Sequence, residues 1–518
     1  MGEDAERIIV GISYSALAAI VSSVFLYIAG VFVMGLLGPE QYGLYQLVFI
    51  VPSLLSPMLN LGIESTMVRF VPKYLVSDPA RATSTTRYLL LIRVAISLLA
   101  TLAMFLLSPW IARLLDEPVS VGVRAASVFL LSNLLYIFVQ AIFQAYFLMR
   151  ERAVVITVYG VAYMAIVIPM IFSGMEYLAP ITAFALAGLL AMLTGFILAW
   201  RKGLAIFGLP SGGGISLREE IRFAAPVYSS SLLGILFAWI GVILIKAFGF
   251  DVVSIGYFRG IYNIVSAGLL VATSLAVVVM PYVSELESKG NHAALAFFCT
   301  KVTKLLIVLG LPAAVGLSLL SKALLEALLP GYLEAVMMMQ ILSLLLLFMP
   351  IYNVSNTILI GIGKPDLVNY ASAIICAVAL IAGAALGAIA GIEGVALAYV
   401  ISMFVGLVFS VAMMTKHTSA SVELYSTAKA ILATALMSPA VYLVLGRTLA
   451  PLARLGLAVL VGLAVYSAVA YVSGTLTEED FRMLRTALAI AKQKTTGSRE
   501  VGPTGAEQER VDEHHTKQ

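Results

Sequence analysis

The sequence predicts an all-α polytopic membrane protein, on the basis of its composition and the arrangement of its apolar residues. Of the 518 residues, 61% are hydrophobic and 12% are charged, and the mean hydropathy is +1.01. Soluble globular chains carry about 25% charged residues, because a large folded surface must be covered by polar groups. The apolar residues also form uninterrupted runs of about 20 residues, the length that a bilayer helix needs. These runs lack the alternation of β-barrel strands.

Clusters of charge, proline and glycine divide the chain into about fourteen candidate spans. The first apolar run follows an acidic N-terminus and is too long for a cleaved signal peptide, so it is expected to remain as the first span. The predicted spans cover residues 10–37, 42–63, 86–108, 119–147, 153–173, 178–200, 221–248, 255–280, 299–321, 333–361, 367–388, 392–415, 424–445 and 451–473.

Basic residues predict the orientation of these spans. Most of the 32 Lys and Arg residues lie in the N-terminus, the even-numbered loops and the C-terminal tail. Positive residues favour the cytoplasmic side of a membrane. Both termini are therefore expected in the cytoplasm. Two loops show the pattern most clearly, one with Arg69, Lys73, Arg81 and Arg87, the other with Arg201, Lys202, Arg218 and Arg222.

Two segments 213 residues apart indicate an internal repeat. LLGPEQYGLY at 36–45 resembles GFDVVSIGYF at 249–258, so that Gly43 corresponds to Gly256 and Tyr45 to Phe258. Each repeat would contain six spans, and an even number leaves both halves facing the same way. The expected relation is a pseudo-two-fold axis along the membrane normal, as in transporters with parallel repeats.

The repeat predicts five segments along the chain. Residues 1–200 form an N-terminal six-helix bundle, 201–220 a cytoplasmic linker, 221–415 a C-terminal six-helix bundle and 416–474 an appended helix pair. Residues 475–518 are expected to form a cytoplasmic interfacial helix at 477–494 and a disordered tail. The linker carries a Gly triplet at 212–214, but no Gly-Lys-Ser/Thr follows it, so a phosphate loop is not expected.

Two hairpins carry a resemblance to a known family. LLGPEQYGLYQLVFIVPSLLSPMLNLGIESTMVRFVPKYL at 36–75 resembles the first hairpin of polysaccharide-type flippases, members of the multidrug/oligosaccharidyl-lipid/polysaccharide exporter superfamily. IRFAAPVYSSS at 221–231 and KAFGFDVVSIGYFRGIYNI at 246–264 resemble the hairpin that opens their second bundle. The seventh span departs from the family pattern, because Trp239-Ile240-Gly241 stands where an ionisable residue is often found.

The resemblance implies a function and a location. The chain would be a flippase in the cell membrane that moves an oligosaccharide on a polyprenyl phosphate or pyrophosphate from the cytoplasmic to the outer leaflet. It would work by alternating access through a central cationic cavity, for the assembly of surface polysaccharide or glycoprotein. The implied partners are the lipid-linked oligosaccharide, membrane lipids and glycan-assembly enzymes.

Arg259 is the leading candidate for binding such a substrate. Ionisable side chains inside a membrane are costly and are functional by default. Arg259 lies in the eighth predicted span beside Tyr257, Tyr262 and Asn263. The arginine could bind the phosphate while its neighbours contact the sugar. The alternative is an arginine whose charged end reaches the headgroups.

Other polar residues in the spans are further substrate-binding candidates. Arg93, Arg124 and Lys246 could bind phosphate or anchor spans at the membrane surface. Gln140, Gln144 and Asn353 could bind sugar hydroxyls or hydrogen-bond neighbouring helices, which contributes about 1 kcal/mol or less.

Five residues are assigned gating or structural roles. Glu64 and Arg69 close the second span and are expected to pair or to anchor the loop, with contact to substrate as the alternative. Prolines remove a backbone hydrogen bond and bend helices. Kinks could serve a rocking motion or be purely structural, and the candidates are Pro52, Pro57 and Pro226.

Three rival functions are weaker. An ion-coupled multidrug antiporter needs a membrane-buried carboxylate, and the first and seventh spans contain none. A membrane glycosyltransferase or polymerase needs a carboxylate-bearing outer loop, and the outer loops hold only scattered acids. A non-transporting scaffold has no positive support beyond the C-terminal tail. We therefore expect no catalytic residues, no cofactor and no nucleic-acid partner. All four histidines lie in polar stretches, so no metal site is expected within the spans.

Overall fold

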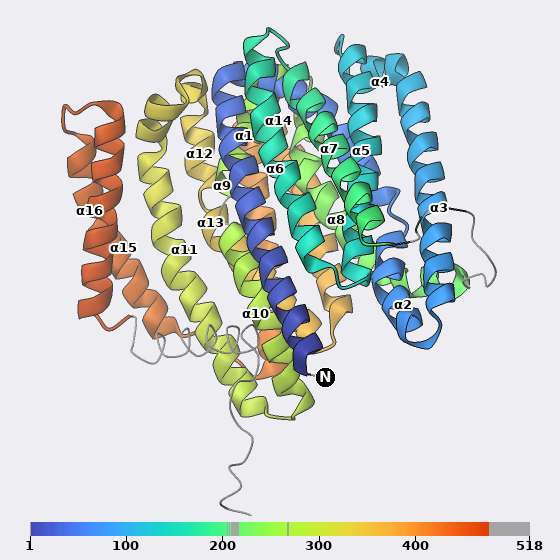
Figure 1. Ribbon diagram of the computed structural model, residues 1–518. Helices are drawn as coiled ribbons and strands as arrows, with labels where there is room; N and C mark the ends of the chain where they lie inside the picture. The colour runs from blue at the N-terminus through green and yellow to red at the C-terminus, as the bar shows by residue number, and fades with distance from the viewer. Residues whose placement is uncertain (1, 205, 207, 209–216, 267–268, 476–518) are drawn as a thin grey trace, which may run out of the picture.

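The computed structural model describes residues 2–204, 206, 208, 217–266 and 269–475 (Figure 1). Within that part of the chain, the side chains of 2–17, 20, 217–231, 269–274 and 276–278 are not described. The Gly triplet at 212–214 and the predicted tail segments at 477–494 and 495–518 lie outside the described residues.

The regular structure of the described residues is entirely helical. The helices are α1 (Gly2–Met58), α2 (Ile63–Ser77), α3 (Pro79–Leu106), α4 (Ser108–Leu114), α5 (Ser120–Ala145), α6 (Met149–Phe172), α7 (Leu178–Arg201), α8 (Leu217–Ala247), α9 (Val252–Ser266), α10 (Leu269–Ser288), α11 (His292–Leu328), η1 (Pro330–Ala335), α12 (Val336–Leu342), α13 (Leu345–Gly361), α14 (Pro365–Thr418), α15 (Leu424–Leu445) and α16 (Pro451–Val472). This confirms the predicted fold class.

Nine helices in the described part of the chain are long and apolar enough to cross a membrane. A tenth span results if Pro330–Leu342 and Leu345–Gly361, which meet at 46°, are taken together. Two long helices also contain breaks at predicted turns: α1 at Gly38, with φ of 68°, and α14 at Ala390 and Gly391. The count of fourteen spans stays a prediction.

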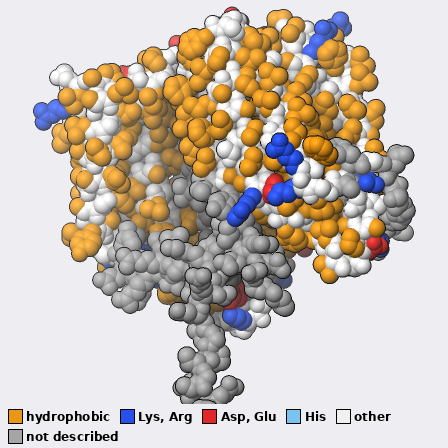
Figure 2. Space-filling model, in the orientation of Figure 1, with side chains coloured by type: hydrophobic (Ala, Val, Ile, Leu, Met, Phe, Trp, Pro, Cys, Tyr) orange, Lys and Arg blue, Asp and Glu red, His pale blue; other side chains and the backbone are white. Residues whose placement is uncertain are grey.

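The outer surface agrees with a membrane location. Figure 2 shows a face covered largely by hydrophobic side chains. Large apolar residues are exposed along most of the long helices, with Leu99 of α3 at 68% and Leu443 of α15 at 72%. A water-soluble protein rarely exposes a continuous apolar patch of this kind. The chain is therefore a multi-pass membrane protein.

The long helices run side by side, with the C-terminal pair α15 and α16 at one edge against α11 (Figure 1). Helix α1 packs against α6 and also against α9, while α8 packs against α14. One large apolar cluster extends through α1 to α14. A separate small cluster joins α11 to α15 and α16. The division into two bundles and an appended pair stays a prediction.

The two halves of the bundle meet through the glycines of the proposed repeat. A Cβ atom on Gly43 would lie 2.0 Å from the carbonyl oxygen of Val252, and one on Gly256 would lie 1.9 Å from that of Pro39. Only glycine permits such an approach. The contact is reciprocal, because Pro39 and Val252 are themselves 213 residues apart. This is the contact pattern that a pseudo-two-fold axis would produce. We call this end of the bundle the hairpin end.

Candidate functional site

A cavity of about 200 Å³ lies between α1, α6, α7 and α9, where the two halves meet. Two hydrogen bonds join α1 to α9 beside it. The Asn263 side-chain amide donates to the Tyr42 hydroxyl at 2.6 Å, and the Tyr27 hydroxyl donates to the carbonyl of Ile264 at 3.2 Å. The polar side chains that line the cavity include Tyr27, Tyr42, Tyr45, Gln46, Tyr163 and Asn263.

Arg259 lies behind this cavity, and its side chain is fixed from three directions. Its Nε donates to Oε1 of Gln46 at 3.1 Å, and its Nη1 donates to the carbonyl of Ala238 at 2.9 Å. The guanidinium carbon lies 4.1 Å from the centre of the Trp239 ring and 5.4 Å from that of Tyr262. Helices α1, α8 and α9 thus position one guanidinium.

The charge of Arg259 has no carboxylate partner among the described residues. Arg259 is only 8% exposed, and its hydrogen-bond acceptors are neutral. A buried charge is costly unless it is paired. Aromatic faces offset only about 0.5–2 kcal/mol of such a cost. An anion in this region would supply the charge that the protein lacks.

Arg93 has a different environment. Its side chain is fully buried, forms an ion pair with Glu64, and donates from Nη1 to the carbonyl of Leu59 at 3.1 Å. These partners flank a break between α1 and α2, where Leu61 and Gly62 have φ of 48° and 77°. The sequence suggested that Glu64 pairs with Arg69 or anchors the loop, and the structure gives it Arg93, 29 residues away.

Arg69 and Arg124, two further charged candidates, are not among the residues that line the cavity. Arg69 is exposed on α2 and packs near the Phe70 ring. Arg124 is exposed and donates from Nε to the Ser108 hydroxyl at 3.0 Å.

Two contacts hold charged or polar candidates at the hairpin end. Lys246 of α8 forms an ion pair with Glu117 at 3.2 Å, which connects the two halves. The Tyr257 hydroxyl donates to Glu334 at 3.1 Å within the second half.

The amide and proline candidates are not gathered at the cavity. Gln140 and Gln144 are half-buried on α5. The Asn353 amide donates to the carbonyl of Met349 in its own helix at 2.8 Å. Its neighbour Asn356 instead joins α13 to α14 by accepting from the Ser410 hydroxyl at 2.9 Å. Three prolines lie within helices as expected, Pro52 and Pro57 in α1 and Pro226 in α8.

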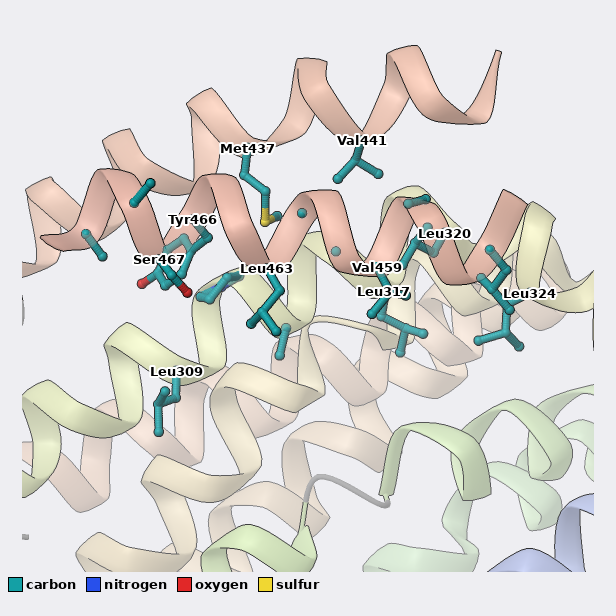
Figure 3. A pocket seen from close by; sticks show the side chains of 18 of the residues that line it. Leu309, Leu317, Leu320, Leu324, Met437, Val441, Val459, Leu463, Tyr466 and Ser467 are labelled. Atoms are coloured by element: carbon teal, nitrogen blue, oxygen red, sulfur yellow. The ribbon is translucent and has the colours of Figure 1, made fainter. Parts of the chain in front are cut away.

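A second, larger cavity lies in the C-terminal part of the protein. It has a volume of about 930 Å³ and is lined by α11, α15 and α16. Figure 3 shows Leu309, Leu317 and Leu463 along it, and nearly all other lining side chains are apolar as well. The Tyr466 hydroxyl donates to the carbonyl of Val308 at 2.5 Å and so connects α16 to α11 beside the cavity. We call this cavity the apolar groove.

Residues 8–287 match the model of a family described as polysaccharide biosynthesis protein. This match spans more than half of the chain. The chain belongs to the polysaccharide biosynthesis protein family. A search of curated proteins finds no match. Family membership confirms the relationship that the two hairpins indicated.

Solved structures similar to this family member share its fold. A lipid II flippase MurJ in an inward closed conformation has a TM-score of 0.67 and 17% identity, with 88% of this chain and 98% of that chain covered. An inward-facing multidrug resistance MATE family transporter of the MOP superfamily has a TM-score of 0.65 and 16% identity, with 77% and 94% covered. The Vibrio cholerae MATE transporter VcmN in the bent form has a TM-score of 0.54 and 13% identity, with 80% and 98% covered.

These matches give the family member a MurJ- and MATE-like fold. The matched structures are a flippase and transporters, not enzymes. The cavity and Arg259 therefore lie inside a fold that is shared with transporters.

The sequence did not identify several residues around the cavity of this family member. Tyr42 and Tyr45 follow one another at helical spacing, which was a signal that they line a common surface. Gln46 had a signal of its own, because the repeat offset of 213 residues makes it the counterpart of Arg259. Trp239 stood out only as a departure from the family pattern, and the structure places its ring against Arg259. Tyr27 and Tyr163 carried no local signal, because a single tyrosine in an apolar helix has many uses.

Proposed function

We propose that this protein moves a polyprenyl phosphate- or pyrophosphate-linked oligosaccharide from the cytoplasmic to the outer leaflet by alternating access. The observation that carries the proposal is the buried guanidinium of Arg259, which has no carboxylate partner among the described residues and lies beside a cavity lined by tyrosines. A phosphate is the anion that a guanidinium binds well, through paired hydrogen bonds. Hydroxyl and amide groups beside it can bind sugar.

The chemistry of the cargo explains why such a site is needed. Carrying sugar hydroxyls and phosphates through hydrocarbon leaves polar groups unsatisfied, at several kcal/mol for each group. A polar cavity between two halves shields the head from lipid. We assign the polyprenyl chain to the apolar groove, whose lining suits a long hydrocarbon. Membrane lipids and glycan-assembly enzymes are the further partners of the proposal.

We place the functional parts along the chain as the repeat suggests. Residues 1–200 and 221–415 act as the two moving bundles, 201–220 as a cytoplasmic linker, 416–474 as the appended pair and 475–518 as a cytoplasmic segment. Both termini are assigned to the cytoplasm of a cell whose plasma membrane holds the protein. Lys246, Arg124 and Arg93 remain further substrate-binding candidates, together with Gln140, Gln144 and Asn353.

An ion-coupled antiporter is the alternative, and Glu64 is the observation in its favour. It is the one buried carboxylate among the described side chains. However, Glu64 is already paired with Arg93, and a neighbouring positive charge opposes the binding of a proton or a sodium ion. The unpaired buried charge at Arg259 favours an anionic cargo over a cationic drug.

Transport of a labelled polyprenyl pyrophosphate-linked sugar by purified protein in liposomes tests the proposal. Arg259→Ala is expected to reduce the rate by about tenfold or more, because a hydrogen bond to a charged group contributes about 1.5–3 kcal/mol. Arg113→Ala, at an exposed arginine of α4, is the matched control and should keep the wild-type rate. If drugs or sodium move and the lipid-linked sugar does not, the proposal is wrong.

A further inference from the structure

Gln46 and Arg259 are the same position in the two copies of the proposed repeat, and they bond to each other. Their separation in the chain is 213 residues, the offset that relates Gly43 to Gly256. The bond runs from Nε of Arg259 to Oε1 of Gln46 over 3.1 Å. Both residues are nearly buried, at 3% and 8% exposed. The bond therefore crosses between the two halves of the protein.

The bond lies about one turn beyond the glycine contact that closes the hairpin end. Gly43 and Gly256 bring α1 and α9 into backbone contact there, and neither offers a side chain to hold the other helix. Polar bonds across the halves must then contribute to holding this end closed. Besides Arg259 with Gln46, they include Asn263 with Tyr42 and Lys246 with Glu117.

The bond from Arg259 to Gln46 is one that a phosphate can replace. An amide oxygen is a neutral acceptor, and a phosphate oxygen is a charged one, so hydrogen bonds to the phosphate are roughly twice as strong. Gln46 lines the cavity, so a group that enters the cavity meets Gln46, and Arg259 lies directly behind it at 3.1 Å. In addition, Arg259 has no carboxylate among the described residues that a phosphate would need to displace.

We propose that Gln46 and Arg259 form a latch between the two halves, and that the phosphate group of the cargo opens it by taking Arg259 away from Gln46. The latch rests on the proposed function only in that the cargo carries phosphate. In the closed state Arg259 binds Gln46, and in the loaded state it binds phosphate. A ligand shifts a conformational equilibrium only by binding one state better than the other. Phosphate should bind the open state better than the latched state, because in the latched state Nε of Arg259 is already hydrogen-bonded to Gln46.

Two substitutions at Gln46 separate the latch from simple packing. Gln46→Glu places a carboxylate on Arg259, so the latch should stay closed and the affinity for pyrophosphate should fall by about tenfold or more. Gln46→Ala removes the acceptor, so the hairpin end should open in the absence of ligand. Gln340→Glu, at an exposed glutamine of α12, is the matched control for added charge and should behave as the wild type.

Spin labels at Leu114 of α4 and Ile389 of α14 report the separation of the halves at the hairpin end. These side chains are 68% and 82% exposed. The distance between the labels is measured by pulsed electron paramagnetic resonance with no ligand, with inorganic pyrophosphate and with polyprenyl pyrophosphate. In the wild type, the distance between the labels should increase when an anion is added. In Gln46→Glu the distance should stay short with or without an anion, and in Gln46→Ala it should be long under all three conditions.

The outcomes distinguish the latch from the proposed function. If only polyprenyl pyrophosphate changes the distance, the protein recognises phosphate as part of a lipid. If inorganic pyrophosphate changes the distance as well, the protein recognises the anion itself. Three results would overturn the latch. The distance between the labels in Gln46→Glu could increase with an anion as it does in the wild type, the distance in Gln46→Ala could stay short without ligand, or neither anion could change the wild-type distance. A wild type that responds to pyrophosphate but moves no lipid-linked sugar would keep the latch and refute the cargo.

Discussion

Arg93 stabilises a break in a membrane helix by binding both sides of it. Its guanidinium donates to the Leu59 carbonyl after α1 and pairs with Glu64 in the first turn of α2. Where a helix is interrupted, carbonyl groups lose their partners within the helix. Arg93 supplies one such partner from α3. The position that the sequence proposed for substrate binding is thus occupied by a structural pair in this conformation.

Removing Arg93 should destabilise the protein strongly. Breaking a buried ion pair leaves an uncompensated charge and costs about 3–5 kcal/mol. Arg93→Met should lower the free energy of unfolding in detergent by about that amount. Adding Glu64→Leu should recover much of the loss, since both charges are then gone. Arg81→Met, at an exposed arginine that packs on Tyr74, is the control and should cost less than about 1 kcal/mol. If Arg93→Met alone were as stable as the wild type, this structural role would be contradicted.

At the scale of elements, Glu423 fastens the beginning of α15 to α11. Its carboxylate lies 3.0 Å from Lys301 and 3.7 Å from Lys304, and it accepts from the Ser426 hydroxyl at 2.8 Å. Burial alone would raise the pKa of Glu423, but the hydrogen bonds from Ser426 and Lys301 and the charge of Lys304 outweigh it. The net result is a pKa below the ordinary value of 4.5.

The interactions of Glu423 with Lys301 and Lys304 should be lost in acid. A carboxyl group whose pKa is lower in the folded state stabilises the protein above its unfolded pKa and stops doing so as the pH falls through the folded value. Thermal unfolding in detergent should therefore show a Glu423-dependent loss of stability below about pH 4.5. Glu423→Gln should start from a lower melting temperature at pH 7 and show less of this acid-dependent loss. The same acid-dependent loss in both proteins would exclude Glu423 as its source.

Helices α1 and α9 depend on the absence of side chains where they meet. Gly43→Ala would place a Cβ 2.0 Å from the Val252 carbonyl, so the helices must separate. Overpacking of this kind costs about 1–3 kcal/mol. The variant should melt earlier and should lengthen the distance between labels at Leu114 and Ile389. Gly456→Ala in α16, where nothing lies within 4 Å of the new Cβ, is the control and should be neutral or slightly stabilising.

For the whole molecule, the proposed alternating access requires the two halves to separate at the hairpin end. Lys246 and Glu117 form an ion pair between α8 and the turn before α5, so they are suited to a covalent test of that motion. Lys246→Cys with Glu117→Cys should form a disulfide under oxidation and lose transport, and reduction should restore the rate that the double variant has before oxidation. The natural cysteines Cys299 and Cys376 are buried and should not interfere. Full transport with the disulfide formed would show that this end need not open.

The sequence was sufficient for the fold and for the positions of many turns. Apolar runs and basic loops do not depend on tertiary structure, so Gly38 and the break at 390–391 were found where a turn was expected. Arg259 was likewise recognisable, because a charge within an apolar run is conspicuous. Its partners were not, since Gln46 and Ala238 approach it only after three helices have packed. The pairing of Arg93 with Glu64 required the break between α1 and α2, which involves a left-handed Leu61 that no sequence rule predicts.

The reciprocal contact of Gly43 with Val252 and of Gly256 with Pro39 also bears on ancestry. Two separate copies of a half-length chain could pair through this contact, because a symmetric interface needs only one kind of surface. Such a homodimer would have to place identical residues on both sides of its axis, either two guanidiniums that repel each other or two amides without charge. Fusion of the copies into one chain removes that restriction. Gln46 opposite Arg259 is a combination that a homodimer cannot have and that two diverged copies in one chain can, and it places a single positive charge between the halves.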